Sequence, residues 1–226
     1  MRGAKRKGVL VVGGGEAGGR LTQVLGVYPR DFQVTTVCQE PHPPYERPPL
    51  AKGVLTGKTT RQQCLIWREG DEAWRNVELR LAVSADFINR DAKSVHLSDG
   101  AKLDYDSPVL ATGSSVRRFS VEGAALNGVD YLRNIDDSLA IAERFARSEH
   151  LVLVGGGFIG LEIAASARAQ RIATTLIEAS DRLLARVVPS IVAEQLAKRH
   201  RAEGVGMRMG AMVERFVSGP RGALRG

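Results

Sequence analysis

The sequence predicts an α/β protein built from two similar units, each running strand, glycine-rich turn, helix and strand. The first observation is an internal repeat, because residues 9–19 (VLVVGGGEAGG) align with residues 151–161 (LVLVGGGFIGL). The second is that helix-forming residues follow each copy and lead into another apolar, β-rich run, residues 32–38 and 172–177. The third is an acidic residue after each of these runs. Strands that alternate with helices favour parallel sheets covered by helices.

The glycines of each turn occupy three positions with separate roles. The first permits a tight turn out of the strand, and the second lets the backbone approach a pyrophosphate without a Cβ in the way. The third lets the helix pack closely on the strand, so that the pyrophosphate lies at the positive N-terminus of that helix. These positions are Gly13, Gly15 and Gly18 in the first copy and Gly155, Gly157 and Gly160 in the second.

The acidic residues complete two dinucleotide-binding patterns. Glu40 and Glu178 follow the third glycine of their copies by roughly 20 residues, where a carboxylate accepts hydrogen bonds from a ribose hydroxyl. We therefore expect two Rossmann-like units of the three-layer type. The charge of Glu178 disfavours the 2′-phosphate of NADPH and favours NADH, but Arg182 and Arg186 follow closely and weaken this preference.

A proline-rich loop distinguishes the first copy from the second. Residues 41–57 (PHPPYERPPLAKGVLTG) contain five prolines and are too stiff for a helix or a central strand. A flavin needs a wall beyond the pyrophosphate and gains from a cation near its N1–C2=O or N5 edge. Lys52 is the first candidate for this cation and Arg47 the second, although a solvated surface loop also fits the spacing. We expect FAD in the first unit and NADH in the second.

Another glycine turn and the overall composition complete the expectations from the residues. A strand that runs into Thr112 and Gly113 suits a further contact to the first dinucleotide. The expected domains are residues 1–118 for FAD and residues 119–226 for NADH. The formal net charge of +7 fits an acidic protein partner or an anionic cofactor, and no nucleic-acid-binding motif appears.

Location and cysteine chemistry follow from what the sequence lacks. There is no apolar run long enough to span a membrane and no signal-peptide pattern, so we expect a cytoplasmic protein. Cys38 and Cys64 have neither metal-ligand nor C-x-x-C spacing, and we expect no metal site and no dithiol relay.

Motifs along nearly the whole chain resemble the flavoprotein ferredoxin reductases of bacterial cytochrome P450 and ring-hydroxylating dioxygenase systems. These belong to the larger class of pyridine nucleotide–disulfide oxidoreductase folds. The stretches that carry the resemblance are GGGEAGG, EPHPPYERPPLAKG, YDSPVLATGSSVRR, YLRN, LVLVGGGFIGLEIAA and LIEASDRLLARVV. The proline-rich block and LIEASDRLLARVV are specific to this branch, whereas the glycine motifs are shared widely.

The resemblance implies two sets of cofactor contacts. The implied FAD contacts are Gly13, Gly15, Ala17, Gly18, Glu40, Arg47, Lys52, Val83, Thr112, Gly113 and Arg133. The implied NADH contacts are Gly155, Gly157, Ile159, Gly160, Glu162, Glu178 and Arg186.

Individual roles also follow from the resemblance. Val83 would offer backbone hydrogen bonds to adenine, and Glu162 would lie near the nicotinamide carboxamide. Lys52 and Glu162 are thus the expected catalytic residues. The implied reaction is hydride transfer from NADH to FAD, followed by single-electron transfer to an acidic [2Fe–2S] ferredoxin.

One departure from the family pattern leaves alternatives open. The resemblance implies a later segment with an aspartate for the flavin ribityl chain and a C-terminal interface domain, and neither pattern occurs in the sequence. We therefore expect a C-terminally truncated form, with no strand in residues 217–226, that binds FAD weakly or not at all. The alternatives are a remnant that binds nucleotide without turnover, or an NADH oxidase, quinone reductase or apoptosis-inducing-factor-like reductase of the same fold.

Overall fold

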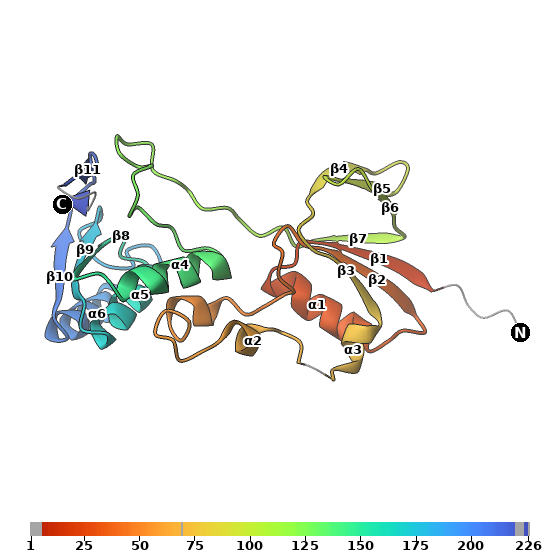
Figure 1. Ribbon diagram of the computed structural model, residues 1–226, viewed down its shortest axis with the longest axis horizontal. Helices are drawn as coiled ribbons and strands as arrows, with labels where there is room; N and C mark the ends of the chain where they lie inside the picture. Colours follow the sequence, from red (N-terminus) through yellow and green to blue (C-terminus); the bar gives the residue numbers. More distant parts are fainter. Residues whose placement is uncertain (1–5, 69, 220–223, 226) are drawn as a thin grey trace, which may run out of the picture. The chain divides into compact units, whose positions relative to one another are not determined.

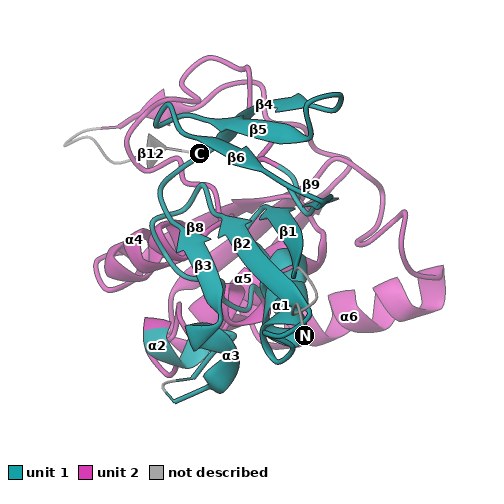
Figure 2. Ribbon diagram, turned by 90° about the vertical axis from the view of Figure 1, so that its right-hand side faces the viewer, with its two compact units in different colours: residues 1–47, 62–114 teal, residues 48–61, 115–226 magenta. Residues whose placement is uncertain are grey.

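The computed structural model describes residues 6–68, 70–219 and 224–225, which form two compact units (Figure 1). The first unit comprises residues 1–47 and 62–114, and the second comprises residues 48–61 and 115–226 (Figure 2). Both units contain a parallel sheet and helices, so the predicted α/β class with two Rossmann-like units is confirmed.

The second half of the proline-rich loop packs with the second unit, although we expected residues 1–118 to stay together. The side chains of Ser138 and Ser166 donate hydrogen bonds to the carbonyls of Leu50 and Ala51, at 2.7 and 2.8 Å. Ala51 also shares an apolar core with side chains of the second unit, and Leu55 belongs to the same cluster. Long-range packing, rather than chain order, thus decides where residues 48–61 belong.

The first unit is built on a four-stranded parallel sheet of order β3-β2-β1-β7. Val9, Val11 and Val34 form an apolar layer on one face, against which Leu21 and Leu25 of the long helix pack. The strands are β1 (Lys7–Val12), β2 (Phe32–Val37), β3 (Val77–Arg80) and β7 (Ser107–Leu110). The helices are α1 (Glu16–Gly26) and the short α2 (Arg61–Cys64) and α3 (Glu72–Arg75), with α2 beginning at the unit boundary.

An antiparallel meander covers the other face of this sheet, opposite α1 (Figure 1). Its strands are β4 (Ala85–Asn89), β5 (Ser94–Leu97) and β6 (Lys102–Asp104). Leu10 and Val12 pack against Val95 and Leu97 of the meander. The first unit therefore has the three layers expected of a dinucleotide-binding domain: helix, parallel sheet and meander.

The second unit is built on a three-stranded parallel sheet of order β10-β9-β8. A capping box between Asn134 and Asp137 starts the first helix. Core side chains of the three long helices pack against Leu151, Leu153 and Leu176 on one face of the sheet. The helices are α4 (Ile135–Phe145), α5 (Phe158–Ala169) and α6 (Ser190–Ala202), with η1 (Pro48–Ala51) beside them, and the strands are β8 (His150–Val154), β9 (Ala173–Glu178) and β10 (Val205–Met209).

The other face of β8 is open in the described part of the chain. Val152 and Val154 are 43% and 39% exposed, whereas Leu10 on β1 is only 2% exposed. Near the C-terminus β11 (Val217–Ser218) and β12 (Leu224–Arg225) pair antiparallel. The expectation of no strand there was wrong for these residues, because a segment rich in glycine and arginine lacks the alternation of apolar and polar residues that predicts a strand.

In the described residues, no helix combines the length and the apolar character required to cross a membrane.

Candidate functional site

The two glycine turns have the same backbone geometry. Gly13 has a φ of +116° and Gly155 has a φ of +111°. Residues other than glycine rarely adopt this backbone region. The N–H groups of the two glycines donate to the carbonyls of Val37 and Ile177, at 2.9 and 2.8 Å, and thereby join each turn to the neighbouring strand. The structure thus contains the tight turn that the sequence predicts at both positions.

The third glycine of each turn allows helix and turn to approach closely. A Cβ on Gly18 would lie 1.9 Å from the carbonyl oxygen of Gly13, and one on Gly160 would lie 2.1 Å from that of Gly155. Backbone atoms cannot move aside as the end of a side chain can. Only glycine therefore fits at these two positions.

The second glycine of each turn faces open space. A Cβ built on Gly15 or Gly157 has no neighbour within 4 Å. Both residues are helix N-caps, and glycine has no side chain that could accept a hydrogen bond. The first N–H groups of α1 and α5 therefore have no acceptor on their N-cap side chains. An open space at an uncapped helix N-terminus fits a pyrophosphate, and the described residues place one at the glycine turn of each unit.

Glu40 and Glu178 do not occupy equivalent positions relative to their strands. Val12 lies opposite Val37 and Val154 lies opposite Ile177, so Cys38 is the structural counterpart of Glu178. Glu40 lies two residues further along the chain. The sequence pattern treated the two glutamates as equivalent, and the strand register corrects this.

Backbone N–H groups hold the carboxylate of Glu178. Gly156 donates to one carboxylate oxygen at 2.6 Å and Ser180 donates to the other at 2.8 Å. Partial burial raises the pKa of Glu178, but these bonds and the charge of Arg186 outweigh it and lower the pKa below its usual value. The carboxylate is therefore ionised at neutral pH, and it can still accept a hydrogen bond from a ribose hydroxyl.

Side chains hold the carboxylate of Glu40 instead. The Tyr45 hydroxyl donates to one carboxylate oxygen, and the Arg47 guanidinium donates to the other. Arg47 was the second candidate for a flavin cation, and the structure places its guanidinium on Glu40 and Tyr45. The sequence analysis missed Tyr45; its place in the proline-rich block between Glu40 and Arg47 was the available signal.

Three further residues expected at the first dinucleotide lie on the segments beside the glycine turn of the first unit. Thr112 follows β7, and its backbone nitrogen would lie 3.0 Å from a Cβ on Gly13. Val83 donates its N–H to the carbonyl of Cys38 at 3.1 Å. Gly113 has a φ of +66°. These residues meet at the carboxyl ends of parallel strands, where open α/β sheets bind ligands.

The two expected catalytic residues meet within the second unit. Lys52 Nζ lies 2.9 Å from a carboxylate oxygen of Glu162 on α5. Both side chains are partly exposed, so the pair remains accessible. Arg133, which we expected at FAD, lies next to the N-cap of α4 in this unit and donates its N–H to Asp137 at 2.9 Å.

The two arginines after β9 differ in availability. The guanidinium of Arg182 donates to the carbonyls of Val188 and Ala185, at 2.9 and 2.6 Å. Arg186 acts on Glu178 through its charge. Arg182 therefore stabilises the loop after β9, and Arg186 is the cation available beside Glu178.

Neither cysteine has the character of a reactive thiol. Burial, together with the charge of Glu40, raises the pKa of Cys38 to about 12. Burial and the charge of Glu46 also raise the pKa of Cys64. Both cysteines are buried, and neither forms a disulfide.

We therefore expect native Cys38 and Cys64 to react with iodoacetamide at pH 8 at least about 100-fold more slowly than in urea. The reason is that only the thiolate is nucleophilic and burial also limits access. Mass spectrometry of the alkylated peptides over time measures both rates. Rapid modification of the native chain at Cys38 would contradict the buried, protonated thiol.

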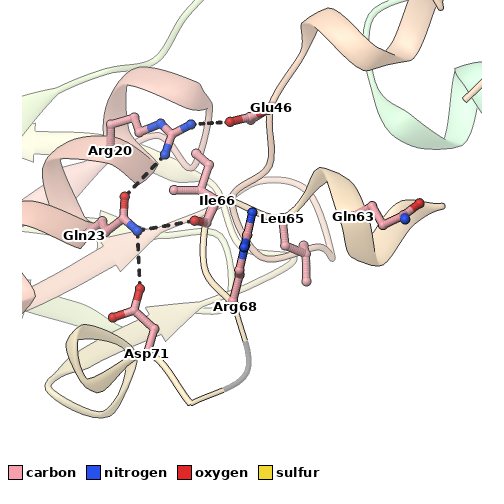
Figure 3. Close-up of a pocket in the computed structure, with 8 residues that line it drawn as sticks. All are labelled: Arg20, Gln23, Glu46, Gln63, Leu65, Ile66, Arg68 and Asp71. Carbon is pink, nitrogen blue, oxygen red and sulfur yellow. Dashed lines mark hydrogen bonds and ion pairs between the residues drawn. The ribbon is translucent and has the colours of Figure 1, made fainter. Parts of the chain in front are cut away.

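The first unit also contains a polar cavity of about 330 Å³, lined by side chains of α1 and of residues 46–71 (Figure 3). Arg20 pairs with Glu46, and Gln23 donates to Asp71 and to the carbonyl of Ile66, both at 3.3 Å. These bonds tie α1 to the proline-rich loop and to the segment after it, and none of the residues expected at a cofactor lines the cavity. Its lining residues are Arg20, Gln23, Glu46, Gln63, Leu65, Ile66, Arg68 and Asp71.

Known proteins resemble this chain over nearly its whole length. Residues 7–224 match the family model described as pyridine nucleotide-disulphide oxidoreductase. The ferredoxin–NAD(+) reductase component of the p-cumate 2,3-dioxygenase system of Pseudomonas putida is 35% identical over 215 residues, which cover 94% of this chain and 53% of that protein. Rhodocoxin reductase of Rhodococcus erythropolis is 34% identical, with 91% of this chain and 48% of the relative covered.

Solved structures give the same result. The ferredoxin reductase for the CYP199A2 system from Rhodopseudomonas palustris superposes on this chain with a TM-score of 0.88 at 30% sequence identity. The superposition covers 95% of this chain and 53% of the reductase. Putidaredoxin reductase in its covalent complex with putidaredoxin gives a TM-score of 0.85 at 33% identity, with 95% and 52% covered. The chain thus spans about half the length of the relatives it matches.

Proposed function

Because the chain belongs to the pyridine nucleotide-disulphide oxidoreductase family, we propose that its first unit binds FAD and its second unit binds NADH. The observation that carries this proposal is the pair of uncapped helix N-termini at Gly15 and Gly157, each with open space in front of it. Two such places in one chain fit two dinucleotides. Glu40 and Glu178 supply a carboxylate beside each of them.

The chain's own residues orient the reactants rather than attack them. Bound FAD would supply a ring that accepts a hydride from NADH and releases the electrons one at a time. Glu162 would accept a hydrogen bond from the nicotinamide carboxamide, and the ion pair with Lys52 holds its carboxylate in place. Arg47 and Tyr45 hold Glu40 for the adenosine part of FAD.

A ferredoxin is the electron acceptor that the relatives favour. The p-cumate relative is named as a ferredoxin–NAD(+) reductase component, and a solved relative is bound to putidaredoxin. The formal net charge of +7 favours an acidic partner, because opposite charges steer encounter and select orientation. We therefore propose a [2Fe–2S] ferredoxin as the acceptor.

The ferredoxin proposal is tested with the purified chain, FAD and NADH, using cytochrome c reduction as the readout. We expect cytochrome c to be reduced rapidly only after a [2Fe–2S] ferredoxin is added. An equal rate without ferredoxin, or rapid oxygen consumption in its place, would favour the oxidase or quinone reductase alternative.

The choice between NADH and NADPH is proposed to depend on Glu178. Replacing it with glutamine removes the charge that repels a 2′-phosphate and leaves Arg186 beside the ribose. We expect the ratio of NADPH to NADH affinity to rise about tenfold, because one charge pair at close range contributes on the order of 1–4 kcal/mol. Isothermal titration of both nucleotides measures this ratio.

The matched control is Asp181→Asn, which removes one negative charge from the same loop without changing Glu178. We expect this variant to keep the ratio of the unmodified chain. Equal shifts in Glu178→Gln and Asp181→Asn would indicate a general charge effect and contradict the role of Glu178.

A further inference from the structure

The position of Glu178 is occupied by a cysteine in the first unit. The parallel registers of β1–β2 and β8–β9 make Cys38 the counterpart of Glu178. A Cβ on Gly14 would lie 2.2 Å from the sulfur of Cys38, so the thiol fills the place beside the turn. At the corresponding place in the second unit, a carboxylate oxygen of Glu178 accepts a hydrogen bond from the N–H of Gly156. Glu40 therefore needs other donors to fix its carboxylate.

The Tyr45 hydroxyl is one of these donors, and its position is well defined. Tyr45 is 1% exposed, and its hydroxyl donates to one carboxylate oxygen of Glu40. The same hydroxyl accepts a hydrogen bond from Arg47 at 2.7 Å. The guanidinium of Arg47 lies 4.6 Å from the centre of the Tyr45 ring and donates to the other oxygen of Glu40 at 2.5 Å.

This arrangement leaves Glu40 free to bind a diol. Each carboxylate oxygen has two lone-pair sites, and Tyr45 and Arg47 take one site on each oxygen. The remaining sites accept hydrogen bonds from the two neighbouring hydroxyls of a ribose. A carboxylate that is already oriented loses less conformational freedom on binding than a mobile one.

We propose that Tyr45 is a positioning residue that orients Glu40 for the adenosine ribose of FAD. The inference rests on the proposed FAD site in the first unit. In the first unit the Tyr45 hydroxyl would orient the carboxylate of Glu40, as the N–H of Gly156 orients the carboxylate of Glu178 in the second unit.

The test uses Tyr45→Phe in the full chain, because phenylalanine keeps the buried ring and removes only the hydroxyl. We expect the dissociation constant for FAD, measured by quenching of flavin fluorescence, to rise about tenfold. The matched control is Tyr105→Phe, another buried tyrosine of the same unit, which we expect to change FAD affinity less than about twofold.

A double-mutant cycle with Glu40→Gln separates positioning from a merely structural role. If Tyr45 acts through Glu40, then Tyr45→Phe has no further effect in the Glu40→Gln background. Glu40→Gln alone is expected to weaken FAD binding at least as much as Tyr45→Phe. NADH affinity is expected to stay unchanged in each variant.

Three results would overturn the inference while the unmodified chain binds FAD. These are an unchanged FAD affinity in Tyr45→Phe, an equal loss in both backgrounds of the cycle, or a loss accompanied by a lower unfolding midpoint and weaker NADH binding. If the unmodified chain itself shows no FAD binding, the proposed function fails instead.

Discussion

Replacement of Gly157 with aspartate is expected to abolish NADH binding while the second unit stays folded. The backbone at Gly157 is extended, and a Cβ there meets no atom within 4 Å, so the new side chain fits. Aspartate at a helix N-cap also satisfies the first N–H groups of α5, which stabilises the helix by a few tenths of a kcal/mol relative to glycine. Those N–H groups are the ones a pyrophosphate would use, and the new charge repels it.

We expect the dissociation constant for NADH to rise at least about 100-fold, because charge-assisted hydrogen bonds are lost and a like charge is added. Isothermal titration measures the affinity, and urea unfolding measures the free energy of unfolding. Gly15→Asp is the matched variant in the first unit, which should lose FAD and keep NADH. NADH affinity within threefold of the unmodified chain would show that the pyrophosphate does not lie at the N-terminus of α5.

Replacement of Gly13 with alanine is expected to destabilise the first unit by at least about 3 kcal/mol. Two effects add together at this position. The φ of +116° is unfavourable for alanine, and the new Cβ would lie 2.2 Å from the carbonyl oxygen of Ala111, directly after β7. A backbone oxygen in a sheet has little room to move.

Gly155→Ala is the matched control, since Gly155 has nearly the same φ but no atom within 4 Å of its Cβ. Only the backbone strain remains there, and we expect a loss of about 1–2 kcal/mol in the second unit. Hydrogen exchange followed by mass spectrometry reports the stability of each unit from its own peptides. Equal losses in the two variants would contradict the close packing of the first turn on the segment after β7.

Local signals in the sequence were sufficient to predict the two turns. The conformations of Gly13 and Gly155 follow from residues within one strand–turn–helix segment, and the repeat makes the pattern stand out. The alternation of strands and helices was enough for the α/β class. In both cases the chemistry that decides the structure lies within a few residues.

The remaining features depend on contacts between distant residues. Residues 48–61 join the second unit because Leu50 and Ala51 bond to serines of α4 and α5, which no local pattern indicates. The non-equivalence of Glu40 and Glu178 depends on strand register, since a cysteine takes the first position after β2. The sequence likewise does not predict that the guanidinium of Arg182 donates hydrogen bonds to two backbone carbonyls.

The most direct measurement of the proposed function is a visible spectrum of the purified chain after incubation with FAD and removal of unbound flavin, followed by anaerobic addition of NADH. We expect flavin absorption bands that NADH bleaches, because one chain then holds both dinucleotides and passes a hydride between them. A colourless chain, or bound flavin that stays oxidised with excess NADH, would contradict the proposed oxidoreductase.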